Sequence, residues 1–386
     1  MDRNTFTGLF LIMIILAGGV FLMKPSEAEL KKEREVQRAD SLKRAGVKEP
    51  AKNQEKLAAT PVKTVDTAAL SGPFGGNITG TEQTTVLENE NLKITFNNLG
   101  GKIQSVEVKN EKTYGNKPLV LFAGNQNKFG LNLNIAGKIT NTNDLYFTAT
   151  KTGNGVTMRA NYSADKFVDF VYALPANGSN LDFNINLTGF NQVLQGNNVN
   201  LNWETTLLQQ EKDAKKEQEH SGPYFKYLEE TPDHLDLHKD EKKELTEGKI
   251  EWFSFKQHFF SAVLIPTVPF DKGNLEVKVS TEPGKIKWYG ANMTLPFNQL
   301  PAQNYNFKFY FGTNKFSTLK DQGHEIEKQV DLGYWPLKYI NRFVVLPVFN
   351  FLEGFNWGYG LIILVLTILL KLAMSPLTYK SYVSMA

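Results

Sequence analysis

Hydrophobic and polar positions follow two different patterns along this chain of 386 residues. Near both ends, long stretches carry no charge, which is typical of membrane-spanning helices. Between them, short segments alternate apolar and polar residues and are separated by Asn-Gly, Gly-Gly, Asn-Asn or proline, which is typical of strands joined by turns. These patterns predict a mixed membrane protein in which a large antiparallel β-sandwich lies between two transmembrane helices.

The first uncharged stretch covers residues 5–23 and contains 19 residues, close to the length that a helix needs to cross a bilayer. We predict an N-terminal transmembrane anchor over residues 1–25. A cleaved signal peptide is the alternative, because Arg3 could form a short basic region and residues 26–28 (Ser-Glu-Ala) a cleavage site. The apolar stretch is longer than the core of a usual signal peptide, which favours the uncleaved anchor.

Residues 26–82 form a predicted tether between the anchor and the sandwich. The first half is rich in charge and poor in apolar residues, and the second half is rich in Thr, Pro, Ser and Gly. Such a composition buries little apolar surface, so we expect a solvated helical or disordered linker.

Alternating segments fill residues 83–320, the predicted β-sandwich. One segment, EKDAKKEQEH at residues 211–220, breaks the alternation and carries more charge than a core element. We predict a short exposed helix or loop there.

A helical pattern appears in residues 321–353, with Lys338, Arg342 and Glu353 opposite an apolar face. A helix packed on a soluble core would show the same pattern, but the position just before a membrane span favours a helix in the membrane interface, bent at Pro347. The residues that we assign to this interfacial helix are Trp335, Leu337, Ile340, Val344, Val348 and Phe351.

The second span is predicted over residues 354–386, where 17 uncharged residues precede Lys371. A charge at the middle of a membrane helix costs of the order of 3 kcal/mol, so such residues usually face protein or water. Alternatively, the side chain of Lys371 extends to the headgroups, since it lies only five residues, roughly 7 to 8 Å, before Pro376. Spacing alone favours the headgroups.

Composition narrows the possible functions. The 43 basic and 40 acidic residues nearly cancel, to a net charge of +3, which gives no case for nucleic acid as a partner. The chain has no cysteine, which excludes disulfides, thiolate zinc sites and cysteine nucleophiles. An apolar content of 41% is enough for a large core.

Candidate chemistry is sparse. His234 and His238, in DHLDLH, have a spacing that could place two imidazoles on one helix face, but a third ligand and a metalloprotease glutamate are missing. We predict solvated loop histidines, no metal, no cofactor and no enzymatic activity. A second hypothesis is a tethered carbohydrate-binding or mutarotase-like sandwich, which as an enzyme needs a histidine and a glutamate facing each other. His258 lies in a strand-like apolar segment, and the sequence indicates no partner for it. A passive scaffold is the third hypothesis.

Motifs at the C-terminal end resemble the first part of the shared membrane region of YidC-type insertases (YidC/Oxa family). The matching elements are N-W-G, one basic residue in an apolar helix, P-L-T and S-M-A. Upstream, residues 252–266, 309–323 and 331–335 resemble that family's periplasmic segments, and residues 92–110 resemble the opening strands of a mutarotase-like sandwich. The core-motif residues are Asn356, Trp357, Gly358, Pro376, Leu377 and Thr378.

The resemblance implies a multi-pass protein of the bacterial inner membrane with a cytoplasmic N-terminus and a periplasmic sandwich. It implies a membrane protein insertase and chaperone, acting alone or with the Sec translocon. Its partners would be nascent membrane-protein substrates, the Sec translocon, the ribosome and the lipid bilayer. Lys371 matches the arginine that supplies the positive charge of a water-filled groove in the family.

Two departures from the family pattern stand out. Lysine replaces arginine at position 371, which keeps the charge but loses the planar set of donors. The family also continues past Ala386 with a cytoplasmic hairpin and further spanning helices. We therefore expect a fragment that carries the groove charge but lacks most of the insertase core.

Overall fold

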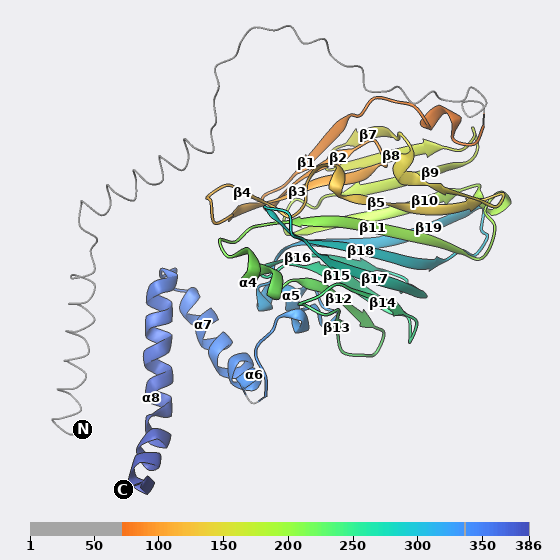
Figure 1. Cartoon of the computed structure of the whole chain (residues 1–386). Coiled ribbons are helices and arrows are strands. Elements are labelled where there is room, and N and C mark those ends of the chain that lie inside the picture. The colour runs from red at the N-terminus through yellow and green to blue at the C-terminus, as the bar shows by residue number, and fades with distance from the viewer. Residues whose placement is uncertain (1–71, 336, 386) are drawn as a thin grey trace, which may run out of the picture. The chain divides into compact units, whose positions relative to one another are not determined.

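A computed structural model of the chain describes residues 72–335 and 337–385 (Figure 1). The predicted anchor over residues 1–25, and the predicted tether up to residue 71, lie outside the described residues. All strand pairs within the described part are antiparallel, and they form three sheets.

The first sheet has four strands in chain order and opens the sandwich. Its hairpin between the second and third strands turns at Gly100 and Gly101, which have φ angles of 84° and 59° that favour glycine. The Asn-Asn and Gly-Gly pairs in this segment thus mark a turn, as predicted. The strands are β1 (Thr84–Glu88), β2 (Leu92–Asn97), β3 (Lys102–Lys112) and β4 (Pro118–Val120).

The second sheet has nine strands in the order β13-β12-β15-β16-β19-β10-β9-β8-β7. The strands are β7 (Thr148–Thr152), β8 (Gly155–Asn161), β9 (Phe167–Ala173), β10 (Asn180–Thr188), β12 (Gly222–Tyr227), β13 (Asp233–His234), β15 (Ile250–Lys256), β16 (Phe260–Pro266) and β19 (Ala302–Thr313).

The third sheet has six strands in the order β14-β17-β18-β11-β5-β6. The strands are β5 (Lys128–Ile135), β6 (Lys138–Asn141), β11 (Asn198–Leu208), β14 (Glu241–Leu245), β17 (Lys272–Val279) and β18 (Lys285–Pro296). Short 3-10 turns join strands at η2 (Gly124–Gln126), η3 (Thr142–Asp144) and η4 (Phe190–Gln192), while η1 (Gly75–Asn77) precedes β1 and η5 (Ile326–Gln329) follows the last strand.

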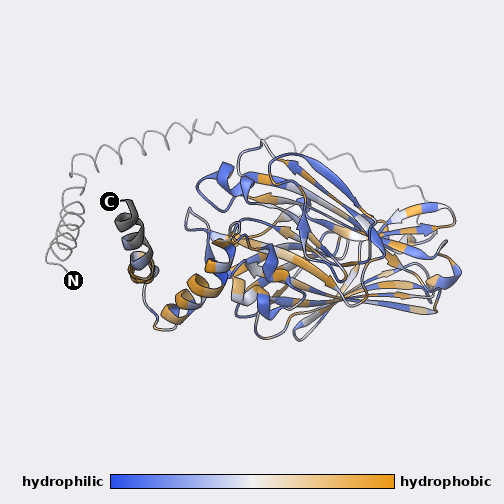
Figure 2. Ribbon diagram, turned by 90° about the horizontal axis from the view of Figure 1, so that it is seen from below, coloured by the Kyte–Doolittle hydropathy of each residue, from blue (hydrophilic) through white to orange (hydrophobic). Residues whose placement is uncertain are grey.

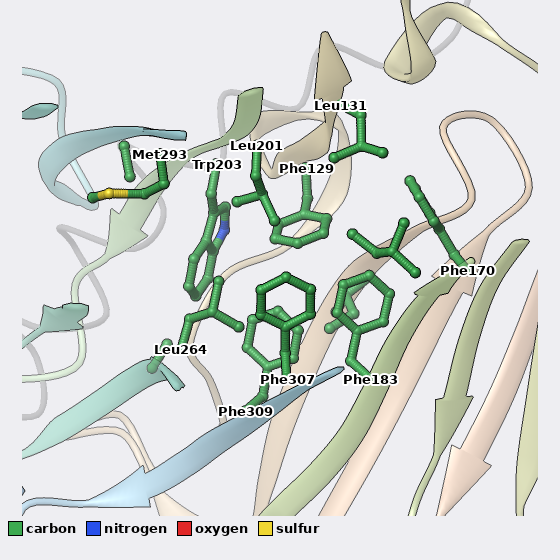
Figure 3. Close-up of a cluster of buried hydrophobic side chains, with 14 of the residues drawn as sticks. Phe129, Leu131, Phe170, Phe183, Leu201, Trp203, Leu264, Met293, Phe307 and Phe309 are labelled. Atoms are coloured by element: carbon green, nitrogen blue, oxygen red, sulfur yellow. The ribbon is translucent and has the colours of Figure 1, made fainter. Parts of the chain in front are cut away.

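The main core lies between the nine-stranded and six-stranded sheets (Figure 3). Trp203 of β11 meets Phe309 of β19 at 5.4 Å between ring centroids, and Phe183 of β10 stacks on Phe307 at 5.6 Å. Both sheets present alternate residues to this core, and Figure 2 shows the alternation as orange and blue along the strands. The prediction of a large antiparallel β-sandwich is confirmed.

The outer face of the nine-stranded sheet is covered near β15 and β16 by α5 (Phe316–Asp321) and η5. Leu319 and Ile326 pack there with Trp252, whose indole N–H donates to the carbonyl of His324 at 2.9 Å. With both faces covered, β12 and β16 are buried along their whole length.

The charged segment at residues 211–220 forms α4 (Ala214–Glu219), so the predicted short helix exists. Lys212, Asp213, Lys215 and Lys216 are exposed, in agreement with the prediction, but Glu217 is only 1% exposed. Its carboxylate accepts hydrogen bonds from the backbone N–H groups of Gln210 and Glu211 at 3.1 Å, and from the side-chain amide of Gln257. These bonds allow the carboxylate to be buried.

Helices follow the sandwich. α6 (Leu337–Ile340) continues into a π-helical turn (Asn341–Val345) and then α7 (Leu346–Glu353), and α8 (Tyr359–Met385) ends the described chain. Pro347 stands at the first turn of α7, directly after the π-helical turn. Proline lacks the N–H of a helical hydrogen bond and its ring crowds the carbonyl four residues earlier, which accounts for the change of helix type where we predicted a bend.

Candidate functional site

Lys371 lies inside α8, and its side chain is exposed on the helix surface. Thr367 and Ser375 stand four residues before and after it, so the three residues share one face of the helix. The other positions of the helix from Leu361 to Leu370 are apolar. Lys371 is therefore the centre of a narrow polar stripe on an otherwise apolar helix.

Pro376 interrupts the hydrogen bonds of α8 just after this stripe, yet the helix continues to Met385. A proline at position 376 leaves the carbonyl of Leu372 without its helical N–H donor. The hydroxyl of Ser375 donates to that carbonyl at 2.8 Å. The side chain thus replaces the missing backbone donor, as serine and threonine do in membrane helices. Leu377 and Thr378, the other residues of the P-L-T motif, continue the helix.

The length of α8 suits a bilayer. Within the described residues, one segment, Tyr359–Pro376, is long and apolar enough to cross a membrane. Exposed tyrosines stand at Tyr359 and Tyr379, which a helix rise of about 1.5 Å per residue places about 30 Å apart, close to the thickness of the hydrocarbon core. Such aromatic residues are common at both membrane surfaces. On this scale Lys371 lies about 18 Å from the first tyrosine and about 12 Å from the second.

Residues 356–358 (Asn-Trp-Gly) form the connection between α7 and α8. Asn356 has a φ angle of 55°, in the left-handed region that asparagine tolerates better than most residues. Trp357 stacks on Phe355 with 5.4 Å between ring centroids, and Gly358 accepts the first backbone hydrogen bonds of α8 through its carbonyl. This motif therefore has a clear structural role as a helix-to-helix turn.

Five of the six residues assigned to the interfacial helix lie in α6, the π-helical turn and α7, whereas Trp335 lies in the turn before α6. Trp335 and Phe351 are 75% and 67% exposed, and Leu337, Ile340 and Val344 are also exposed, while Val348 is half-buried. Figure 2 shows this helix as largely hydrophobic. A contiguous exposed apolar surface of this kind marks contact with a membrane or a partner.

The polar residues of the same helix contact the end of the sandwich. The Arg342 guanidinium lies 5.5 Å from the ring centre of Phe316 in α5. Lys315 pairs with Glu353 at 2.6 Å, and this ion pair lowers the pKa of the Glu353 carboxyl. Arg342 and Glu353 of the polar side thus contact the sandwich domain, while Leu337, Ile340 and Val344 of the apolar side stay exposed within the described part of the chain.

His234 and His238 are both exposed, in agreement with the prediction of solvated histidines. His234 lies in the short strand β13 with its ring tilted by 40° against that of Tyr224 at 4.8 Å, and His238 lies in a bend, so the two are not on one helix face. Within the described residues, no group of three or more His, Cys, Asp or Glu side chains is placed to hold a metal ion.

His258 does have a partner, contrary to the sequence-based expectation. It lies in the turn between β15 and β16, with its Nδ1 atom 2.8 Å from Oε1 of Glu211. The two residues are 47 positions apart, in segments that gave no sign of proximity. No pattern in the sequence could have paired them.

Comparison with known proteins supplies the family. The family model described as the YidC periplasmic domain matches residues 84–347, more than half of the chain. This chain belongs to the YidC family. The match covers the sandwich and extends through α6 into the start of α7.

Curated relatives extend the similarity to the whole chain. A membrane protein insertase YidC from Parabacteroides distasonis is 32% identical over 409 residues, and one from Bacteroides fragilis is 34% identical over 398 residues. Each alignment covers 100% of this chain and 64% of the relative, so this chain spans about two thirds of its relatives' length. The crystal structure of a putative aldose 1-epimerase from Escherichia coli aligns with 60% of this chain and 100% of its own, at 9% identity and a TM-score of 0.40.

Proposed function

We propose that this chain is the membrane-anchored, sandwich-bearing part of an insertase that helps inner-membrane proteins to insert and fold. The observation that carries the proposal is Lys371, a charge on the polar stripe of an apolar helix in a chain whose curated relatives are named membrane protein insertases. The sandwich would lie in the periplasm and the N-terminus in the cytoplasm. No covalent step is part of this function.

The position of Lys371 argues against a merely structural lysine. If Tyr359 and Tyr379 mark the two membrane surfaces, the lysine lies about 12 Å from the nearer surface, whereas its extended side chain reaches only about 6 Å. The charge therefore needs a polar surrounding within the membrane. A water-filled groove formed together with further membrane segments would supply it.

In such a groove the lysine would lower the cost of moving a polar segment across the membrane. An acidic or polar segment that leaves water loses its hydration, which costs several kcal/mol for each unpaired group. A fixed positive charge and retained water offset part of that loss, while the apolar part of the substrate enters the lipid. Nascent membrane proteins are the substrates of this proposal, with the Sec translocon and the ribosome as partners.

The test replaces Lys371 in the full-length gene product, expressed in bacteria depleted of their own insertase. Lys371→Ala should reduce insertion of a substrate with an acidic translocated segment at least tenfold, and Lys371→Arg should retain it. Lys338→Ala, at an exposed lysine outside the span, is the matched control. Normal insertion by Lys371→Ala would show that the side chain simply reaches the headgroups.

A further inference from the structure

An open cleft of about 830 Å³ lies beside the turn between β15 and β16. Three rings form one wall as a continuous stack. His258 lies 3.9 Å from Phe259 and 4.5 Å from His220 between ring centroids, with interplanar angles of 21° and 20°. Phe259 is 52% exposed. A half-exposed phenylalanine ring at the edge of a cleft offers an apolar surface to a ligand.

His258 lines the cleft, and its protonation state decides whether its ring can accept a hydrogen bond. Burial, with the nearby His220 and Lys256, lowers the pKa of His258 to about 4, so the imidazole is neutral at pH 7. Burial raises the pKa of the Glu211 carboxyl. In the neutral tautomer whose Nδ1–H donates to Glu211, the Nε2 atom of His258 keeps a lone pair that can accept a hydrogen bond.

Buried polar residues hold this pair in place. The Glu217 carboxylate fixes the backbone of Gln210 and Glu211 and also accepts from Gln257, the residue just before His258. The Asn314 amide donates to the carbonyls of Gln257 and His258 at 2.8 and 3.0 Å.

The second histidine is fixed in the same way, because the Lys256 ammonium donates to the carbonyl of His220 at 2.8 Å. Glu217 and Lys256 are both buried, and burial shifts the pKa of each toward its neutral form, raising that of Glu217 and lowering that of Lys256 to about 8. Burying such groups lowers stability, so their use around one turn indicates a preorganised site.

The polar groups around the cleft match hydroxyl groups. A hydroxyl group can donate to the Nε2 lone pair of His258 and accept from a lysine of the cleft lining. The charges nearly balance and give little attraction for an anion. The charged lining residues are Glu111, Lys112, Glu211, Lys212, Lys256, Lys315 and Asp331.

We infer that this cleft binds a neutral saccharide, with the C–H face of a sugar ring on Phe259 and a sugar hydroxyl donating to His258 Nε2. The role is separate from the proposed insertion of membrane proteins. The saccharide could be free or could be the headgroup of a glycolipid, because Lys315 at the edge of the cleft pairs with Glu353 on the interfacial helix.

The test uses the full chain in phosphatidylcholine nanodiscs, prepared without sugar-based detergents, which would compete for the site. Saturation-transfer NMR and calorimetry with glucose, galactose, maltose and N-acetylglucosamine should show binding of at least one sugar with a Kd below about 10 mM. A second arm adds a neutral glucosyl diacylglycerol to the nanodiscs. Loss of the soluble-sugar signal there identifies the headgroup as the ligand, and an unchanged signal identifies the free sugar.

Variants locate the binding. Phe259→Ala and His258→Gln should weaken it at least tenfold, and Phe259→Trp should retain it because the ring surface remains. Leu300→Ala and His238→Gln, at exposed residues outside the cleft, are matched controls that should bind as the original chain does. All variants are compared by circular dichroism for folding. The inference is overturned if none of the four sugars and no glycolipid binds, or if Phe259→Ala and His258→Gln bind unchanged.

Failure here is distinguishable from failure of the insertase proposal. Phe259→Ala in the full-length protein should leave insertion unchanged, whereas Lys371→Ala should leave sugar binding unchanged.

Discussion

The hydroxyl of Ser375 donates to the carbonyl of Leu372, the acceptor that Pro376 deprives of its backbone donor. In a membrane this carbonyl has no water with which to form a hydrogen bond. Removing the Ser375 hydroxyl should therefore leave the carbonyl unpaired and destabilise the helix. We predict that Ser375→Ala destabilises α8 by about 1 kcal/mol and speeds amide exchange around Pro376, measured by hydrogen–deuterium exchange in nanodiscs.

Thr367→Ala is the matched control for this bond. The Thr367 hydroxyl donates to the carbonyl of Ile363 at 2.7 Å, a carbonyl that already accepts an ordinary helical hydrogen bond. Its removal should change exchange little. Equal effects of the two substitutions would show that Ser375 does not replace a missing donor.

The exposed apolar surface of the interfacial helix predicts contact with lipid. Trp335 and Trp357 should lie near the headgroups, so lipids brominated along their acyl chains should quench their fluorescence. We expect Trp335→Phe and Trp357→Phe each to reduce measurably the quenching of tryptophan fluorescence when the chain is reconstituted in these lipids. Trp288→Phe, in strand β18 of the sandwich, should remove none, and quenching that depends on Trp288 alone would contradict the assignment.

Acid should weaken the fold through His258. Its pKa is lowered from 6.5 to about 4, chiefly by burial, so between these values the unfolded chain binds a proton that the folded chain does not. The free energy of unfolding therefore falls as the pH falls from 6.5 to 4, by at most about 1.4 kcal/mol per pH unit. Glu211 acts in the opposite direction, because its raised pKa lets the folded carboxyl take up a proton first.

A comparison of variants isolates the histidine. Urea unfolding followed by tryptophan fluorescence at pH 7, 6 and 5 should show the original chain losing about 1 to 2 kcal/mol more than His258→Gln. The His238→Gln control should follow the original chain. If His258→Gln loses stability in parallel with the original chain, the histidine is not held neutral in the fold.

Strands with one buried face could be predicted from the sequence, and others could not. β10 and β8 alternate apolar and polar residues, because one face meets the core and the other meets water, and this pattern predicts a strand. β12 has both faces covered, so no alternation remains to predict it. β11 alternates, but its asparagines resemble turn residues and obscure the pattern.

The two candidate sites differ in the same way. Lys371 is visible in the sequence because a charge within an apolar run is a local signal. The pair of Glu211 and His258 depends on strand pairing over a long stretch of chain, and Glu217 lies in a run of charges that gave no hint of its burial. Contacts between segments far apart in the chain produce no periodic pattern of apolar and polar residues from which they could be predicted.

The two tyrosines of α8 have a consequence for membranes of different thickness. Because the helix is unbroken between Tyr359 and Tyr379, its apolar length is fixed. In a thinner bilayer the helix must tilt to keep that length within the hydrocarbon core. Tilt shortens the distance from Lys371 to the nearer surface, and a thicker bilayer lengthens it. The free-energy cost of holding the Lys371 charge in the membrane would then depend on the lipids around the protein. The strength of its attraction for a polar substrate segment would change with that cost.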